Sequence, residues 1–182
     1  MFMQFDCFAS KSNHHGRNMG GVVVFVKHNI AKFFTRLDSD LKHGIVLKIK
    51  SGIINAFKDT LYLAMYIPPE GSPVYNNADV KGIDIIEELL TKNYNNNVDL
   101  MITGDLNART ACELEYVEIN CNASLFEEYS DIFSNNQVSK RSSCDLTSNS
   151  FGKRLIELCK THALYILNGL LARIKTKDNT HF

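Results

Sequence analysis

An excess of charge of one sign is missing from this chain of 182 residues, because 20 basic side chains balance 20 acidic ones. Proteins that bind nucleic acid mainly by electrostatics are usually basic, so the composition argues against a dedicated electrostatic DNA binder. A small positive groove is still compatible with a neutral total. Hydrophobic residues make up 45% of the chain. This share and the length fit one globular domain, or part of a larger one.

Closely spaced cysteines are missing as well, since none of the five cysteines forms a CxxC pair. An odd number without such pairs argues against a disulfide framework and predicts reduced thiols in the cytoplasm or nucleus. A zinc site built from Cys7, His14 and His15 would need a second close-spaced pair. We therefore expect neither disulfides nor structural zinc.

No hydrophobic run approaches the length that spans a membrane, and the N-terminal stretch MFMQFDCFAS has no basic segment before its apolar residues. We therefore expect a soluble, intracellular protein that is not secreted and has no membrane partner. The chain also lacks a P-loop, a GxSxG nucleophile elbow and an HExxH motif. These absences exclude the reactions that depend on those motifs.

The pattern of apolar residues predicts an α/β protein. Residues 1–19 are interpreted as a mobile lead-in and residues 20–182 as one incomplete domain. Strands are predicted over residues 20–27 (buried), 43–50 (half-exposed) and 59–67, the last ended by two prolines. Short connections between these strands favour antiparallel neighbours and a mixed sheet.

The second half of the chain alternates between helix and strand patterns. Apolar residues at helical spacing predict one helix near residues 80–90 and another from Ser150, with Asn149 or Ser150 as its N-cap. Short strands are predicted at 98–103, which we expect to be fully buried, and at 164–169. The stretch SLFEEYSDIF is compatible with a short helix.

A group of polar residues follows the strand at 98–103, in the sequence GDLNART. Asp105 and Asn107 stand two positions apart just past a strand end, so both side chains can point into one cleft. A carboxylate there could orient a water or hold a metal ion, and an amide could bind an oxyanion. Gly-Asp-x-Asn is also ordinary turn chemistry, in which Asp and Asn bond their own backbone. The local pattern leaves both interpretations open.

Four blocks in this order resemble one family: GGVVVFVK at 20–27, LYLAMYIPPEGSP at 61–73, LMITGDLNART at 100–110, and the long stretch from Arg141 to Gly169 that ends in ILNG. They are similar to the endonuclease/exonuclease/phosphatase superfamily. The fourth block resembles its branch encoded by non-long-terminal-repeat retrotransposons. Together the blocks span residues 20–169.

The resemblance implies a four-layer α/β sandwich, here partial, with mixed β-sheets flanked by helices. It also implies Mg²⁺-dependent hydrolysis of phosphodiester bonds, with DNA as the partner. Asp105 matches the residue that orients or deprotonates the attacking water, and Asn107 matches the amide beside the phosphate. Tyr66 matches the tyrosine whose hydroxyl contacts the scissile phosphate. Arg109 belongs to the motif and is expected to brace the loop rather than touch substrate.

The chain departs from the family pattern at both ends. The family's metal-binding Glu lies well before the GG strand, yet only nineteen residues precede Gly20 here. The family's later Asp and terminal Ser-Asp-His have no match, and His181 is not their equivalent. One Asp is a poor magnesium site. We therefore expect a fragment that binds Mg²⁺ weakly, is inactive or nearly so, and depends on missing flanking sequence or a partner chain.

Two alternatives remain open at this point. The first is a non-catalytic nucleic-acid-binding or interaction module on the same fold. The second is a phosphatase of the same superfamily that acts on small phosphoesters, which the retrotransposon-like fourth block argues against.

Overall fold

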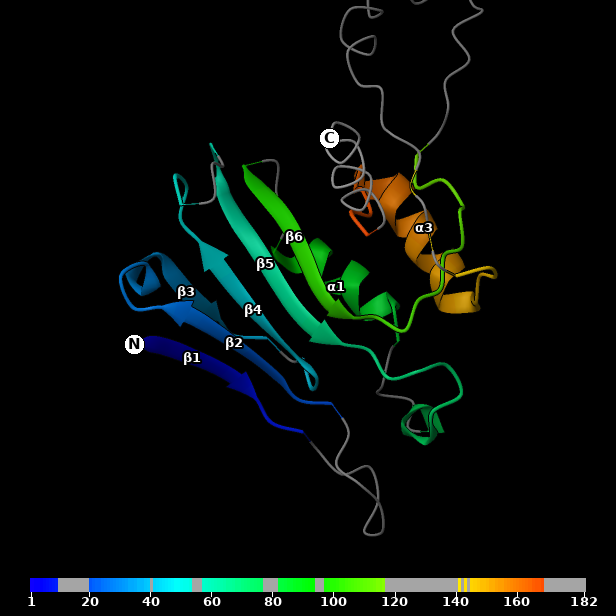
Figure 1. Cartoon of the computed structure of the whole chain (residues 1–182), viewed down its shortest axis with the longest axis horizontal. Coiled ribbons are helices and arrows are strands. Elements are labelled where there is room, and N and C mark those ends of the chain that lie inside the picture. Colours follow the sequence, from blue (N-terminus) through cyan, green and yellow to red (C-terminus); the bar gives the residue numbers. More distant parts are fainter. Residues whose placement is uncertain are drawn as a thin grey trace, which may run out of the picture. The chain divides into compact units, whose positions relative to one another are not determined.

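The computed structural model describes residues 1–9, 20–39, 41–53, 57–76, 82–93, 97–116, 141, 143 and 145–168 (Figure 1). The chain divides into two compact units, Met1–Asn107 and Ala108–Phe182. In the first unit the elements are β1 (Phe2–Cys7), β2 (Val22–Lys27), η1 (Ala31–Phe33), β3 (Phe34–Leu37), β4 (Gly44–Ile49), β5 (Asp59–Tyr66), η2 (Pro73–Asn76), α1 (Asp84–Asn93) and β6 (Val98–Asp105). In the second unit the described helix is α3 (Ser150–His162).

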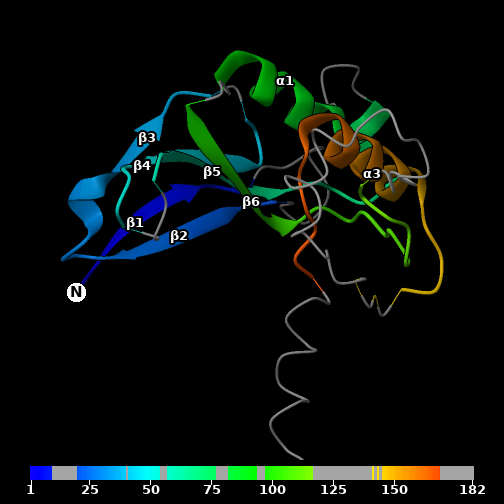
Figure 2. The same ribbon diagram turned by 90° about the horizontal axis from the view of Figure 1, so that it is seen from above.

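The strands of the first unit form two sheets, which confirms the expected α/β class and mixed sheet. β1 and β2 pair antiparallel. The other sheet has the order β3-β4-β5-β6, in which the pair β5–β6 is parallel and the others are antiparallel. In Figure 2, α1 lies on one side of this four-stranded sheet and the β1–β2 pair lies on the other.

Strand β1 was missed by the sequence interpretation, which treated residues 1–19 as a mobile lead-in. Phe2 pairs with Lys27 and Cys7 pairs with Val22, so this strand lines the full length of β2. Residues 10–19, including His14 and His15, lie outside the described residues. Much of β1 is exposed, so its sequence MFMQFDC includes polar residues and an acid. It therefore lacks the continuous apolar pattern that predicts a buried strand.

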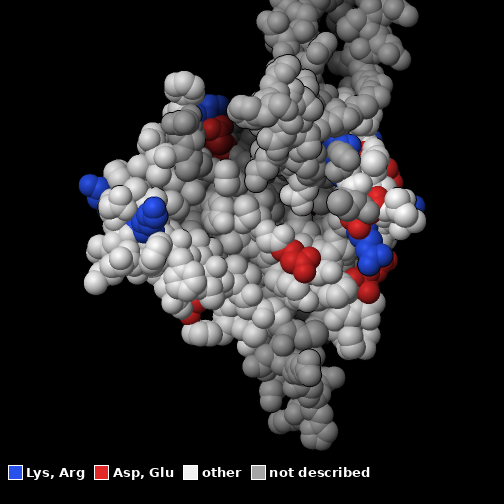
Figure 3. All heavy atoms as spheres, viewed as in Figure 1, with Lys and Arg blue, Asp and Glu red and all other residues white. Residues whose placement is uncertain are grey.

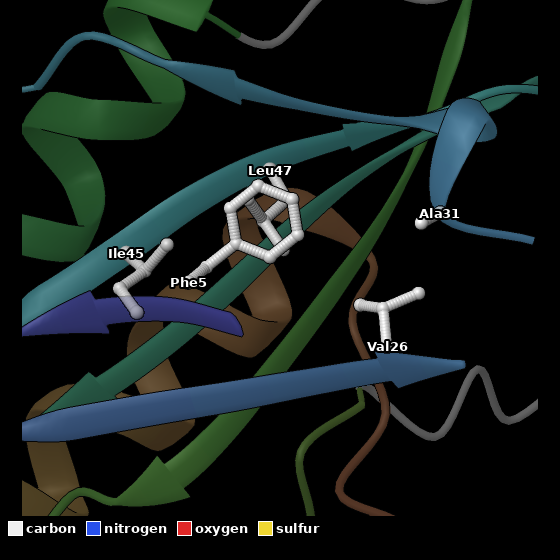
Figure 4. Packing of buried hydrophobic residues seen from close by; sticks show 5 residues of the cluster. All are labelled: Phe5, Val26, Ala31, Ile45 and Leu47. Atoms are coloured by element: carbon white, nitrogen blue, oxygen red, sulfur yellow. The ribbon is translucent and has the colours of Figure 1, made fainter. Parts of the chain in front are cut away.

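The core between the two sheets is built from side chains on facing strands (Figure 4). Phe5 of β1 and Val26 of β2 pack with Ile45 and Leu47 of β4, and Ala31 of η1 completes the cluster. Leu47 is 0% exposed. Apolar burial of this kind is the main favourable term in folding, so the cluster fastens β1 and β2 to the larger sheet.

Burial in three strands differs from the sequence-based expectations. β4 was expected to be half-exposed, but five of its six residues are buried, because both of its faces are covered. β2 was expected to be buried, yet Phe25 is 64% exposed, since the β1–β2 pair is covered on one face only. β6 was expected to be fully buried and is half-buried to exposed along its length, because β5 is its only strand neighbour among the described residues.

Both helices confirm their predictions. Ile83, Ile86 and Leu90, predicted on one face, are all buried, whereas Val80 lies outside the described residues. In α3, Asn149 is the N-cap, and its side chain accepts a hydrogen bond from the Gly152 N–H at 2.8 Å.

The strand predicted at 164–169 is wrong for its described part. Ala163 adopts the left-handed conformation after α3, and the Leu164 N–H donates to the Cys159 carbonyl. Residues 164–168 then run without strand pairing. Alternating apolar residues form a strand only where a neighbouring strand completes the hydrogen-bond ladder, and here one backbone N–H, that of Ile166, instead donates to the Glu115 carboxylate. The SLFEEYSDIF stretch lies outside the described residues.

The second unit is held by a buried ion pair. The Arg141 Nε lies 3.5 Å from Glu115 Oε2, with both side chains almost fully buried. Arg141 also donates to the carbonyl oxygens of Ala111 and Glu113. Breaking such a pair by removing one partner is costly, since it leaves a buried charge without compensation.

Three of the five cysteines lie in the described part of the chain. Cys7, Cys112 and Cys159 are free thiols. Burial, more than the nearby Glu115 carboxylate, raises the pKa of Cys159 to about 11. None of the helices within the described ranges has the length and apolar character needed to cross a membrane.

Replacing Leu47 tests the core between the sheets. The substitution Leu47→Ala should lower the free energy of unfolding by about 2–5 kcal/mol, because it leaves a cavity among fully buried side chains. Urea unfolding followed by circular dichroism measures the change. The matched control Phe25→Ala, on the exposed face of β2, should cost about 0.5 kcal/mol. Equal losses in both variants would contradict this assignment of the core.

Candidate functional site

The carboxyl ends of β5 and β6 bring two of the predicted site residues together. The strands run parallel and end at the same edge of the sheet (Figure 1). Tyr66 is the register partner of Asp105, so both side chains leave the sheet on the same face. Asp105 is exposed and Tyr66 is half-buried. A carboxylate and a phenol are therefore neighbours at the end of the sheet.

Gly104 makes this pairing possible. Its backbone has φ of 126°, a conformation that side chains rarely adopt. A Cβ at this position would collide with the backbone carbonyl oxygen of Met65 in the neighbouring strand. Only glycine lets β6 approach β5 this closely, immediately before Asp105.

Asn107, the third predicted residue, is fixed by two hydrogen bonds. Its backbone N–H donates to Asp105 Oδ1 at 3.0 Å, and its Nδ2 donates to the carbonyl of Ile67 at 2.9 Å. The residue has φ of 48°, in the left-handed region that Asn tolerates better than most residues. The turn chemistry considered from the sequence is thus present, and it joins Asn107 to both neighbouring strand ends.

The segment after β5 completes the connection. The Ile67 N–H donates to the Asp105 carbonyl at 2.8 Å, while the Ile67 carbonyl accepts from Asn107. Ile67, Asp105 and Asn107 therefore form one hydrogen-bonded group. Together with Tyr66, the register partner of Asp105, they make up what we call the β5–β6 site.

His43 is a neighbour of this site that the sequence interpretation did not find. Its carbonyl accepts a hydrogen bond from the Tyr66 N–H at 2.8 Å, and its ring meets the Tyr66 ring edge-on, with centroids 6.5 Å apart. Burial, and secondarily the Lys42 ammonium, lowers the pKa of His43 below 6.5. The ring is therefore neutral near neutral pH. No local motif signals this role, because it depends on the pairing of β4 with β5.

Tyr75 of η2 is a second neighbour that sequence reasoning missed. Its hydroxyl donates to the Pro68 carbonyl at 2.7 Å. Burial, and secondarily the Tyr66 phenol, raises the pKa of Tyr75 to about 12. Tyr75 therefore keeps its proton at any physiological pH.

Arg109, expected to brace its loop, belongs to the second unit. Its backbone N–H donates to the Asn149 side chain at 2.9 Å, and its carbonyl accepts from the Asn149 N–H at 3.1 Å. Asn149 therefore caps α3 and holds the backbone of Arg109 at the same time. The side chain of Arg109 is exposed.

The donor set does not fit a resident Mg²⁺ ion. Mg²⁺ prefers hard oxygen ligands in octahedral geometry, commonly with one or two carboxylates. The β5–β6 site supplies one carboxylate, Asp105, and the described residues contain no group of three or more Asp, Glu, His or Cys side chains that could hold a metal. Basic and acidic side chains are scattered over the face seen in Figure 3.

Substitution of Gly104 tests the close approach of β5 and β6. Gly104→Ala should lower the free energy of unfolding by more than about 2 kcal/mol, because both the positive φ and the Met65 carbonyl oppose a Cβ. Gly71→Ala is the control, since Gly71 also has a positive φ but open space around it. It should cost about 1 kcal/mol. A loss for Gly104→Ala no larger than that of the control would argue against the close approach.

The lowered pKa of His43 predicts a pH-dependent stability. The unfolded chain takes up the proton near pH 6.5, before the folded chain does, so the free energy of unfolding should fall as the pH drops below 6.5. Denaturant unfolding between pH 5 and 7.5 measures this slope. His43→Gln should flatten it. An unchanged slope in His43→Gln would refute the prediction.

Comparisons of the chain with family models, with curated proteins and with solved structures find no match.

Proposed function

We propose that the β5–β6 site is the phosphate-facing, water-orienting side of a phosphodiesterase site of the DNA endonuclease type encoded by retrotransposons. The observation that carries the proposal is the direct pairing of Tyr66 with Asp105 at the ends of two parallel strands. Strand ends of this kind commonly carry the functional groups of α/β proteins. The ordered motif blocks at 20–27, 61–73 and 100–110 support the same conclusion.

Each residue has a distinct part in this proposal. The Asp105 carboxylate accepts a hydrogen bond from the attacking water and draws its proton away. The Tyr66 hydroxyl donates to a phosphate oxygen, where charge increases during the reaction. Asn107 holds Asp105 and the end of β5 in a fixed relation through its bonds to Asp105 Oδ1 and the Ile67 carbonyl, and its amide lies beside the phosphate.

The proposal also assigns the two sheets and α1 to layers of a sandwich. The two sheets of the first unit are the inner layers of a partial four-layer α/β sandwich, and α1 belongs to an outer layer. The face-to-face packing of β1 and β2 on β4 supports this arrangement, since the inner layers of a sandwich share one apolar core. A nuclear or cytoplasmic location, where DNA is present and thiols stay reduced, completes the proposal.

The reaction rate is limited by the donor set. One carboxylate holds Mg²⁺ weakly, so further oxygen ligands have to come from other parts of the sequence or from a partner chain. We therefore propose that this chain by itself cleaves DNA slowly at best.

A non-catalytic DNA-binding module on the same fold is the second candidate. The single carboxylate of the β5–β6 site favours it, because phosphate contacts need no metal ligands. The two candidates differ in one outcome, which is cleavage of bound DNA.

Nicking of supercoiled plasmid in the presence of Mg²⁺ tests the catalytic part. We expect at most trace nicking by the chain alone, and Asp105→Ala should abolish any trace. Robust nicking that depends on Asp105 would overturn the proposed low activity and establish a complete active site. Robust nicking that survives Asp105→Ala would refute the role of the β5–β6 site.

Binding to a short DNA duplex, measured by fluorescence anisotropy at low and moderate salt, tests the phosphate-facing part. Without a bound cation the Asp105 carboxylate repels phosphate, so Asp105→Asn should strengthen binding, by about two- to fivefold at low salt. Asp99→Asn is the matched control, since it makes the same charge change at the other end of β6 and should have little effect. Equal effects would mean that DNA responds to total charge and not to the site.

A further inference from the structure

The segment from Tyr66 to Pro68 is fastened to its surroundings at every residue. The Tyr66 N–H donates to His43, the Ile67 N–H and carbonyl bond the Asp105–Asn107 loop, and the Pro68 carbonyl accepts from the Tyr75 hydroxyl. Two of these partners, His43 and Tyr75, have no part in the proposed chemistry. His43 nevertheless packs against the Tyr66 ring, and Tyr75 binds the chain two residues after Tyr66.

His43 reaches Tyr66 through ring packing and not through a side-chain hydrogen bond. The interplanar angle of the two rings is 86°, which is the favourable edge-to-face geometry of aromatic pairs. The Nδ1 atom of His43 is buried and makes no hydrogen bond within the described part of the chain. A buried polar atom without a partner is costly, so something other than hydrogen bonding holds the ring in this place.

Gly20 explains how the ring is confined. The residue has φ of 76°, and a Cβ built on it would overlap the Nδ1 atom of His43. The glycine backbone therefore lies directly against the imidazole on one side, while the Tyr66 ring lies near it as well. The ring has no room to swing toward Gly20.

Tyr75 constrains the backbone after Tyr66 from another element. Its hydroxyl donates to the Pro68 carbonyl at 2.7 Å, which fixes the chain two residues after Tyr66. Because Tyr75 stays protonated at neutral pH, its hydroxyl remains a donor to the Pro68 carbonyl. Tyr66 thus has an aromatic neighbour just before β4, and the chain after it is held by a residue of η2.

From this geometry we infer that His43 and Tyr75 are positioning residues, which fix the Tyr66 phenol so that its hydroxyl faces the phosphate of bound DNA. The inference rests on the proposed function, since it assigns the neighbours of a residue that touches the substrate there. His43 acts through its ring shape, held by Gly20, and Tyr75 acts through its bond to Pro68. Neither residue touches the substrate.

A double-mutant cycle on DNA binding tests the inference with the full chain and a short duplex. Tyr66→Phe removes the hydroxyl, and His43→Ala should weaken binding by about threefold or more in the wild-type background, because the hydroxyl is no longer held in place. In the Tyr66→Phe background the same His43→Ala change should have no further effect. His43→Phe keeps a ring in place and should restore most of the affinity.

Tyr75→Phe supplies a second arm, since it removes the bond to Pro68 and keeps the ring. It too should weaken binding only when the Tyr66 hydroxyl is present. NMR of the Tyr66 ring resonances gives an independent readout. These resonances should shift in His43→Ala because a neighbouring ring current is lost, and they should shift much less in Tyr75→Phe.

The outcomes separate the inference from the proposed function. If Tyr66→Phe weakens binding but the His43 and Tyr75 changes are additive to it, the positioning roles are wrong and the proposed function stands. If the wild-type chain does not bind the duplex, or Tyr66→Phe has no effect, the proposed function fails and the inference fails with it. Loss of effect in the Tyr66→Phe background, with rescue by His43→Phe, supports both.

Discussion

The parallel backbone pairing between the ends of β5 and β6 is the constraint on which the candidate site depends. It places Tyr66 opposite Asp105, and it continues one step beyond the strands because the Ile67 N–H reaches the Asp105 carbonyl. Gly104 is the condition for this pairing, since any side chain there would meet the Met65 carbonyl. A backbone contact, set by one residue without a side chain, thus determines which side chains become neighbours.

The stability of the fold and the position of the site lie in different parts of the sheet. β4 and most of β5 are buried between the β1–β2 pair on one face and α1 on the other, so they provide the apolar packing. β6 and the loop after it are half-buried to exposed and carry the polar groups. Functional groups at the margin of a rigid core are held in place by backbone bonds while remaining accessible to a substrate.

Features that depend on residues close together in the sequence could be predicted, whereas contacts between distant segments could not. The Asn149 cap, the buried face of α1 and the end of β5 before its prolines depend on residues close in sequence, and these predictions are confirmed. The burial of β2 and β6 and the absence of a strand at 164–168 depend on which distant segment lies alongside. The apolar patterns of these segments therefore gave wrong predictions. The position of His43 beside Tyr66 and the bond of Tyr75 to Pro68 likewise follow from strand register and a turn, which no short motif encodes.

The turn interpretation and the functional interpretation of GDLN are not alternatives. The Asn107 N–H donates to Asp105 Oδ1, which is the expected turn bond, and it fixes the orientation of the carboxylate. The second oxygen of Asp105 makes no hydrogen bond within the described residues, and the side chain is exposed, so this oxygen can accept a bond from water. A carboxylate with one oxygen held by the backbone and the other facing solvent is better oriented than a mobile surface aspartate. In the proposed function, the turn would therefore orient the Asp105 carboxylate toward the attacking water.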